Sequence, residues 1–337
     1  RLANNGITTI NRGFIMRKIL LASTAIASTF AIASAHAEVS ISGGATMSYQ
    51  SVSDDMTRTA VSDETLGFAD NTITVSFSAV TDSGLSLAYS TNMQASTSQN
   101  ASISGDFGSI AMSGTAHAAE SFDVTSPTMK GGHGDVQVAV EDGTLTSGVG
   151  DDVTTAVREN EADMSHLTGA NIAYYSPSIN GFSFGASIGS LAATDDITSF
   201  GAKYSADMGG VSYSIGYAAS EGAANVSANH MGVSVTAGDI TVGIATADNE
   251  TSTTSKEEVT SYGVTYVMSD ALSLNAGHVN SENTLASKEM TMTSVGASYT
   301  IASGLAAHIA NNSFDYKESS ATVNDGSIMS VMLTLSF

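Results

Sequence analysis

The residues best suited to chemistry in this chain do not form a convincing catalytic set. The stretch Gly181-Phe182-Ser183-Phe184-Gly185 matches the Gly-x-Ser-x-Gly pattern of a nucleophilic serine. That chemistry requires a sharp turn from a strand into a helix, together with a histidine and a carboxylate. Here Ser183 lies in an alternating apolar run with no helical pattern after it. The sequence therefore predicts a strand at this place, and no enzymatic activity.

Histidines and carboxylates offer a second kind of chemistry, the binding of metal ions. His117, His133 and His166 share one long segment, but no two of them have the spacing of metal ligands,. Two acidic pairs could bind Ca²⁺ through their carboxylate oxygens, and a solvated acidic loop explains them as well; they are Asp151 with Asp152 and Asp195 with Asp196. We expect no required cofactor, with Ca²⁺ as the one candidate ion.

The elements that would position these residues are β-strands. In the last eleven residues, apolar side chains at positions 329, 331, 333, 335 and 337 alternate with mostly small polar ones. Period-2 alternation over about ten residues is the length and pattern of a membrane-spanning strand. A closed barrel needs its last strand intact, because that strand pairs with the first and removes both edges.

The same alternation recurs along the chain and predicts sixteen strands. The connections alternate between tight turns and longer polar loops, as in an outer-membrane barrel. Glycines 201, 232, 263 and 296 begin similar hairpins at spacings of 31, 31 and 33 residues. The expected strands are 38–50, 65–80, 84–95, 98–105, 108–116, 168–177, 181–190, 197–206, 210–219, 228–237, 239–248, 259–268, 271–280, 291–302, 304–315 and 326–337.

Aromatic residues near the ends of these strands could form girdles at the two membrane interfaces, although ordinary strand packing explains them nearly as well. They include Tyr49, Phe77, Tyr89, Tyr175, Phe182, Tyr204, Tyr217, Tyr262 and Tyr299.

The start of the chain has the pattern of a secretory signal peptide. A basic start at Met16-Arg17-Lys18, an apolar stretch and the small-x-small site Ala35-His36-Ala37 follow in order,. We expect residues 16–37 to be removed after export, residues 1–15 to be an upstream artefact, and 38–337 to form one barrel domain.

The charge balance is strongly acidic and excludes several partners. The chain has 33 acidic and 11 basic residues, a formal net charge of −22. Such a chain is a poor nucleic-acid binder, because that binding requires cationic neutralisation of phosphates. It favours cations as partners instead. There is no cysteine, so neither a disulfide framework nor a thiolate metal site is expected,.

One long connection interrupts the series of strands. Residues 117–167 lie between the fifth and sixth expected strands and are rich in acidic side chains. Connections of this length are usually functional or disordered.

Four features together resemble the sixteen-stranded general porins of alphaproteobacteria, over nearly all of residues 38–337. They are the start Ala37-Glu38-Val39-Ser40, the stretch Tyr174-Tyr175-Ser176-Pro177 leading to Gly181-Phe182, the place of the long connection, and the terminal Phe337. The resemblance implies an all-β, sixteen-stranded antiparallel transmembrane barrel in the bacterial outer membrane, whose long third loop folds into the pore.

The resemblance also implies a passive diffusion channel, a homotrimer, contact with lipopolysaccharide, and recognition of Phe337 by the barrel-assembly machinery. In the family, loop acids face basic wall residues at a constriction. The implied constriction residues here are Glu120, Asp123, Asp135, Glu141, Asp142 and, on the wall, Lys203. The expected strands before the long connection contain no Lys or Arg, so we expect a negative, cation-preferring pore. A non-conducting barrel acting as an adhesin or anchor remains the alternative, and a membrane hydrolase or secreted soluble β-protein ranks below it.

Overall fold

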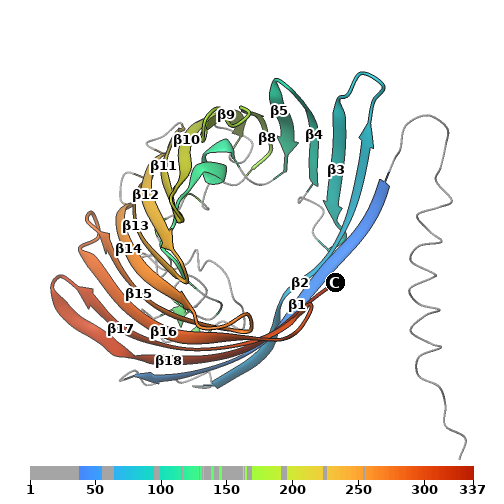
Figure 1. The fold of residues 1–337 in the computed structure, drawn as a ribbon. Coiled ribbons are helices and arrows are strands. Elements are labelled where there is room, and N and C mark those ends of the chain that lie inside the picture. The colour runs from blue at the N-terminus through green and yellow to red at the C-terminus, as the bar shows by residue number, and fades with distance from the viewer. Residues whose placement is uncertain are drawn as a thin grey trace, which may run out of the picture.

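Backbone pairing closes sixteen strands into one antiparallel barrel, seen in a computed structural model of the chain (Figure 1). The structure describes residues 38–54, 64–94, 99–114, 117–128, 130, 132, 138–139, 144–145, 162, 164, 169–190, 196–222, 226–252 and 255–337. The expected signal peptide and residues 1–15 lie outside this part of the chain. Each strand pairs with its neighbours in sequence, and β1 pairs with β18 to complete the ring.

The strands follow the predicted order. They are β1 (Glu38–Asp54), β2 (Glu64–Val80), β3 (Ser86–Asn92), β4 (Gln99–Gly105), β5 (Gly108–Ser113), β8 (Asn171–Tyr175), β9 (Phe182–Ser190), β10 (Asp196–Met208), β11 (Val211–Glu221), β12 (Ser227–Ala237), β13 (Ile240–Ser252), β14 (Ser255–Val267), β15 (Leu272–Asn283), β16 (Lys288–Ala302), β17 (Leu305–Glu318) and β18 (Ala321–Ser336). The long connection contributes the 3₁₀ helix η1 (Ala118–Phe122) and a separate two-stranded sheet, β6 (Val138–Ala139) with β7 (Thr144–Leu145).

All sixteen predicted strands are confirmed, and their boundaries differ mainly at one end. Strands β13 to β18 run several residues further toward the long loops than predicted, as in β14, which begins at Ser255 rather than at 259. On the outward face these extensions carry mainly acids, hydroxyls and the lysines Lys256 and Lys317 instead of large apolar side chains. Backbone pairing continues there without the alternation from which the strands were predicted.

The outer face of the barrel carries the apolar side chains. Every barrel strand carries at least one exposed large hydrophobic residue, and most carry several at alternate positions, such as Ile240, Val242 and Ile244 on β13. Residues directly opposite one another in an antiparallel pair share a face, so Ile244, Tyr262 and His278 all point outward. This apolar outside is what lipid requires of a barrel. None of the described residues forms a helix long and apolar enough to cross a membrane.

The same registers show which side chains point toward the inside of the barrel. Helix η1 lies inside the ring (Figure 1), and it packs against β8, β9, β10 and β11. The Tyr175 ring stacks on Phe122 of η1, with ring centroids 6.3 Å apart. Tyr175 therefore faces the lumen, and its place in an interfacial girdle was predicted wrongly. Its neighbour Tyr174 is the exposed residue of the pair.

The C-terminal residue takes part in closing the barrel. The Phe337 backbone exchanges two hydrogen bonds with Gly43, of 3.0 and 3.1 Å. A side chain at position 43 would meet the Phe337 ring, so glycine makes room for it. The seam between β1 and β18 is thus continued to the last residue of the chain.

We expect deletion of Phe337 to destabilise the folded barrel by about 2 kcal/mol, because two net hydrogen bonds and the ring packing are lost. Urea unfolding in detergent, followed by circular dichroism, measures the effect. Phe337→Leu keeps both backbone hydrogen bonds and should lose less. Equal midpoints for the deletion and the wild type would contradict this role for the seam.

Candidate functional site: the barrel lumen

The first part of the long connection, residues 117–128, lies against the inner wall; we call it the inner segment. Its path is held by hydrogen bonds to wall side chains on four strands. The Ala118 N–H donates to Ser187 Oγ (3.0 Å), and the Ala119 N–H donates to Ser199 Oγ (3.2 Å). Further along, Asn275 Nδ2 donates to the Pro127 carbonyl (3.1 Å). Short polar side chains on the wall thus satisfy backbone groups that would otherwise be buried unpaired.

A row of wall glycines gives the inner segment its place. At each of them, an added Cβ would collide with the segment. At Gly185 and Gly201 it would meet the Phe122 ring, at 2.7 and 2.6 Å. At Gly232 it would overlap the Val124 carbonyl oxygen. The six members of this glycine track, on β9 to β14, are Gly185, Gly201, Gly216, Gly232, Gly243 and Gly263.

The glycine track explains part of the sequence periodicity. Gly201, Gly232 and Gly263 recur at the same place in successive hairpins, and all three contact the inner segment. Gly296, the fourth member of that series, instead approaches the backbone of Ile309 on β17. The regular spacing therefore marks a groove across the wall, and the groove ends before β16.

A histidine and an aspartate fix the middle of the inner segment. His230 Nε2, from β12, accepts a hydrogen bond from the Val124 N–H (3.2 Å). Asp123 Oδ1 lies 4.0 Å from the same nitrogen, and Asp123 Oδ2 accepts from the Met164 N–H (2.8 Å). Asp123 thus ties two parts of the long connection together. His230 gave no sequence signal, because its partners lie about a hundred residues away.

The predicted constriction residues divide into two groups. Glu120 and Asp123 lie on the inner segment, and Lys203 lies on the adjacent wall, where its Nζ donates to the Ser121 carbonyl (3.4 Å). These three are brought together. Asp135, Glu141 and Asp142 lie outside the described residues, as do Asp151, Asp152 and Asp195 of the candidate Ca²⁺ pairs. Asp196 is exposed at the start of β10, and the described residues contain no group of three or more potential metal ligands.

The described lumen wall carries a second basic side chain besides Lys203. Lys203 is the basic wall residue that the sequence analysis named. Lys288 also faces inward, at the long-loop end of β16, because it lies opposite Asn283 and Glu318 on the inner face. Its Nζ lies 3.6 Å from Glu318 Oε1. The stretch from Lys288 reads Lys-Glu-Met-Thr. It has no apolar alternation that would show from the sequence which side chains point inward.

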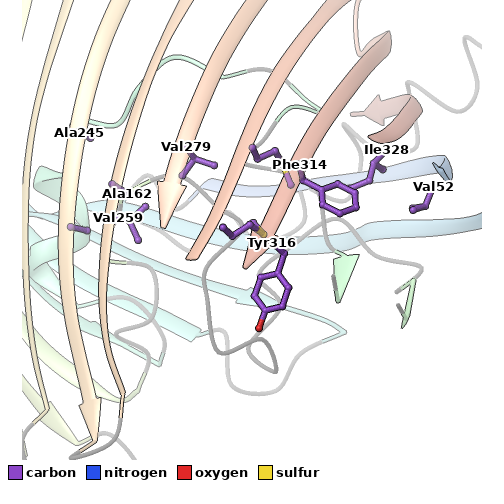
Figure 2. Close-up of a cluster of buried hydrophobic side chains, with 11 residues drawn as sticks. Val52, Ala162, Ala245, Val259, Val279, Phe314, Tyr316 and Ile328 are labelled. Carbon is purple, nitrogen blue, oxygen red and sulfur yellow. The ribbon is translucent and has the colours of Figure 1, made fainter. Parts of the chain in front are cut away.

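A cluster of apolar side chains lies on the inner wall at the long-loop end of β13 to β18 and β1, among equally buried polar ones such as Ser261, Ser281 and Asn312. Figure 2 shows this inner apolar patch, where Ala162 of the long connection lies among the wall side chains. The Ala162 N–H donates to Ser261 Oγ (3.4 Å). Its members are at most 5% exposed; they are Val52, Ala162, Ala245, Ala247, Val259, Val279, Met290, Met292, Phe314, Tyr316 and Ile328. Buried apolar side chains inside a barrel show that this sector is packed against protein rather than water.

Sequence and structure comparisons agree with this architecture. A sequence model of the Gram-negative porin family matches residues 22–319. The chain belongs to the Gram-negative porin family. A search of curated proteins finds no match.

Solved porin structures share the fold at low sequence identity. The trimer form of in-vitro folded OmpT of Vibrio cholerae is 15% identical with a TM-score of 0.59, covering 89% of this chain and 99% of that one. An anion-selective porin from Comamonas acidovorans is 13% identical with a TM-score of 0.56, and a mutant of the Rh. blastica porin is 14% identical with a TM-score of 0.54. Both of these cover 89% of this chain and 100% of their own. The porin is therefore an outer-membrane barrel of sixteen strands, a fold of non-enzymatic channels.

We expect Gly232→Val to displace the inner segment, because the new side chain would occupy the position of the Val124 carbonyl. Overpacking of this kind costs about 1–3 kcal/mol. Single-channel recordings should show a changed conductance, and the urea midpoint should fall. Thr236→Val, on the inner face of the same strand, is the matched control. Unchanged conductance in Gly232→Val would contradict the role of the glycine track.

We expect docking of the inner segment to weaken in acid because of His117. Burial lowers the pKa of His117 below its ordinary value of 6.5. The undocked histidine therefore binds a proton more readily, and docking is fully favourable above pH 6.5 and weakens as the pH falls below it. Hydrogen exchange at Ala118 and Ala119 between pH 7.5 and 5 measures this. The His117→Asn variant should lose that pH dependence, and its persistence there would assign it to another group.

Proposed function

We propose that this porin is a water-filled diffusion channel for small hydrophilic solutes and ions, with a preference for cations. The supporting observation is the distribution of charge at the long-loop end of the described barrel and beside the inner segment. Three of the lysines at the long-loop end lie within ion-pair distance of carboxylates: Lys256 with Glu258, Lys288 with Glu318, and Lys317 with Glu289 and Asp315. Beside the inner segment the wall carries the cation Lys203, and the segment itself carries the two acids Glu120 and Asp123.

A negative potential at the mouth raises the local cation concentration and lowers that of anions. The long-loop ends of β13 to β18 carry an excess of acids, which are Asp248, Glu250, Glu257, Glu258, Glu282, Glu289, Asp315, Glu318 and Asp325. The anion-selective porin among the similar structures shows that the same fold accommodates the opposite preference. Selectivity therefore has to come from side chains, and here these are mainly acidic.

Further features of the proposal come from the family. A homotrimer is supported by the trimer form of the structurally similar OmpT. The proposal also includes contact with lipopolysaccharide and recognition of Phe337 by the barrel-assembly machinery. It includes no catalytic step and no required cofactor. Binding of Ca²⁺ by the acidic pairs remains a proposal that rests on the sequence; the pairs are Asp151 with Asp152 and Asp195 with Asp196.

The inner apolar patch favours one alternative, a non-conducting barrel whose lumen is filled by its own long connection and which serves as an adhesin or anchor. A water-filled pore does not require fully buried Met292, Phe314 or Ile328 on its wall. The two functions are separated by conductance, since the alternative predicts stable insertion into a bilayer without current.

In planar bilayers under a KCl gradient, we expect stepwise openings with a cation-selective reversal potential. Lys203→Gln should shift that potential further toward the cation value, because it removes the positive side chain beside the inner segment. Lys317→Gln, on the outer face of β17, is the matched control and should change it less. Insertion without current would favour the non-conducting barrel, and a chloride-selective potential would overturn the cation preference.

A further inference from the structure

The inner face of β2 to β5 and β8 carries hydroxyl and amide side chains among alanines, and we call this surface the hydroxyl wall. Paired registers align these side chains in rows across the five strands. One row runs Ser76, Ser90, Asn100, Ser113, Asn171. A second runs Ser78, Ala88, Ser102, Ala111, Ala173. A third runs Val80, Ser86, Ser104, Ser109, Tyr175.

The hydroxyl wall is accessible, whereas the inner apolar patch is buried. Its serines on β2 to β5 are exposed or half-buried, whereas the inner apolar patch is at most 5% exposed. A hollow of about 490 Å³ opens on the wall. Its lining combines polar side chains, including Ser90, Asn100, Ser102, Ser109 and Ser113, with the apolar atoms of Phe77, Ala88, Tyr89, Ala101, Ala111 and Tyr175. The hollow is large enough to admit a small organic solute.

The chemistry of the hydroxyl wall is polar without being charged. None of the three rows contains an ionisable acid or base apart from the phenol of Tyr175. A serine hydroxyl both donates and accepts hydrogen bonds, and an asparagine amide does the same with separate atoms. Such a wall matches a solute that carries many hydroxyl groups, and it gives no Coulombic advantage to an ion.

An aromatic ring at the edge of the hollow adds a second type of contact. Tyr175 lines the hollow, and Phe122 of the inner segment supports its ring in a stacked arrangement with an interplanar angle of 25°. A half-buried ring held in this way offers an apolar surface beside polar groups. The C–H faces of a sugar ring pack on such a surface while the sugar hydroxyls reach the serines.

We propose that the hydroxyl wall is a binding site for neutral polyhydroxylated solutes, namely small sugars and polyols, on their way through the pore. This inference rests on the proposed channel function and names a solute class for it. The acidic mouth selects among ions, and the hydroxyl wall retains uncharged solutes. Ser90, Ser102 and Ser113 supply the hydrogen bonds, and Tyr175 supplies the stacking surface.

The test measures sugar-induced interruptions of single-channel KCl current, with glucose and sucrose as the probes. We expect brief blocking events whose frequency rises with sugar concentration. Ser90→Ala combined with Ser102→Ala should shorten the dwell time by about 2- to 10-fold per lost hydrogen bond. Ser234→Ala, on the inner face of β12 and outside the hollow, should leave it unchanged. KCl conductance should stay near that of the wild type in all these variants.

The outcomes separate the inference from the function on which it rests. Normal KCl current without sugar-dependent events would overturn the binding site and leave the channel intact. Events that persist unchanged in the double serine variant would place sugar binding elsewhere and overturn the role of the hydroxyl wall. Absence of KCl current would overturn the channel itself, and the inference with it.

Discussion

Every backbone N–H and C=O inside a lipid bilayer must find a partner within the protein, and the rest of this structure depends on that constraint. It is met by closing sixteen strands through the β1–β18 seam, which continues to the last residue through Gly43 and Phe337. Closure leaves two faces with opposite requirements. The outer face must be apolar where it meets lipid, and the inner face is free to vary from one sector to another.

The inner face uses this freedom in three different ways. On β9 to β14, glycines form a track that accepts the inner segment at backbone distance. On β13 to β18 and β1, apolar side chains pack against part of the same long connection. On β2 to β5 and β8, serines and asparagines line an accessible wall. The lumen is therefore asymmetric, with protein packed on one side and polar surface left open on the other.

The inner segment links these sectors mechanically. Phe122 fills the space left by Gly185 and Gly201 and also supports Tyr175 at the edge of the hydroxyl wall. Asp123 and Val124 attach the segment to His230 and to Met164. Phe122 therefore connects the glycine track to Tyr175 on the lumen surface through direct contacts.

The sequence alone determined the strand count, the strand order and the outer face, because period-2 alternation against lipid is a local property that each strand shows by itself. It also showed glycines 201, 232 and 263 at a regular spacing. The resemblance to porins implied Lys203, Glu120 and Asp123 as constriction residues, and this stays a prediction. Only the tertiary structure decided what those glycines contact, that Tyr175 faces the lumen, and that the inner face is apolar in one sector and hydroxyl-lined in another. The physical reason is distance along the chain: Phe122 meets Gly201, and Val124 meets His230, about eighty to a hundred residues apart. A regular spacing such as that of the glycines does not show which distant residues it contacts, since the inner wall must match a particular segment of the chain rather than a uniform solvent.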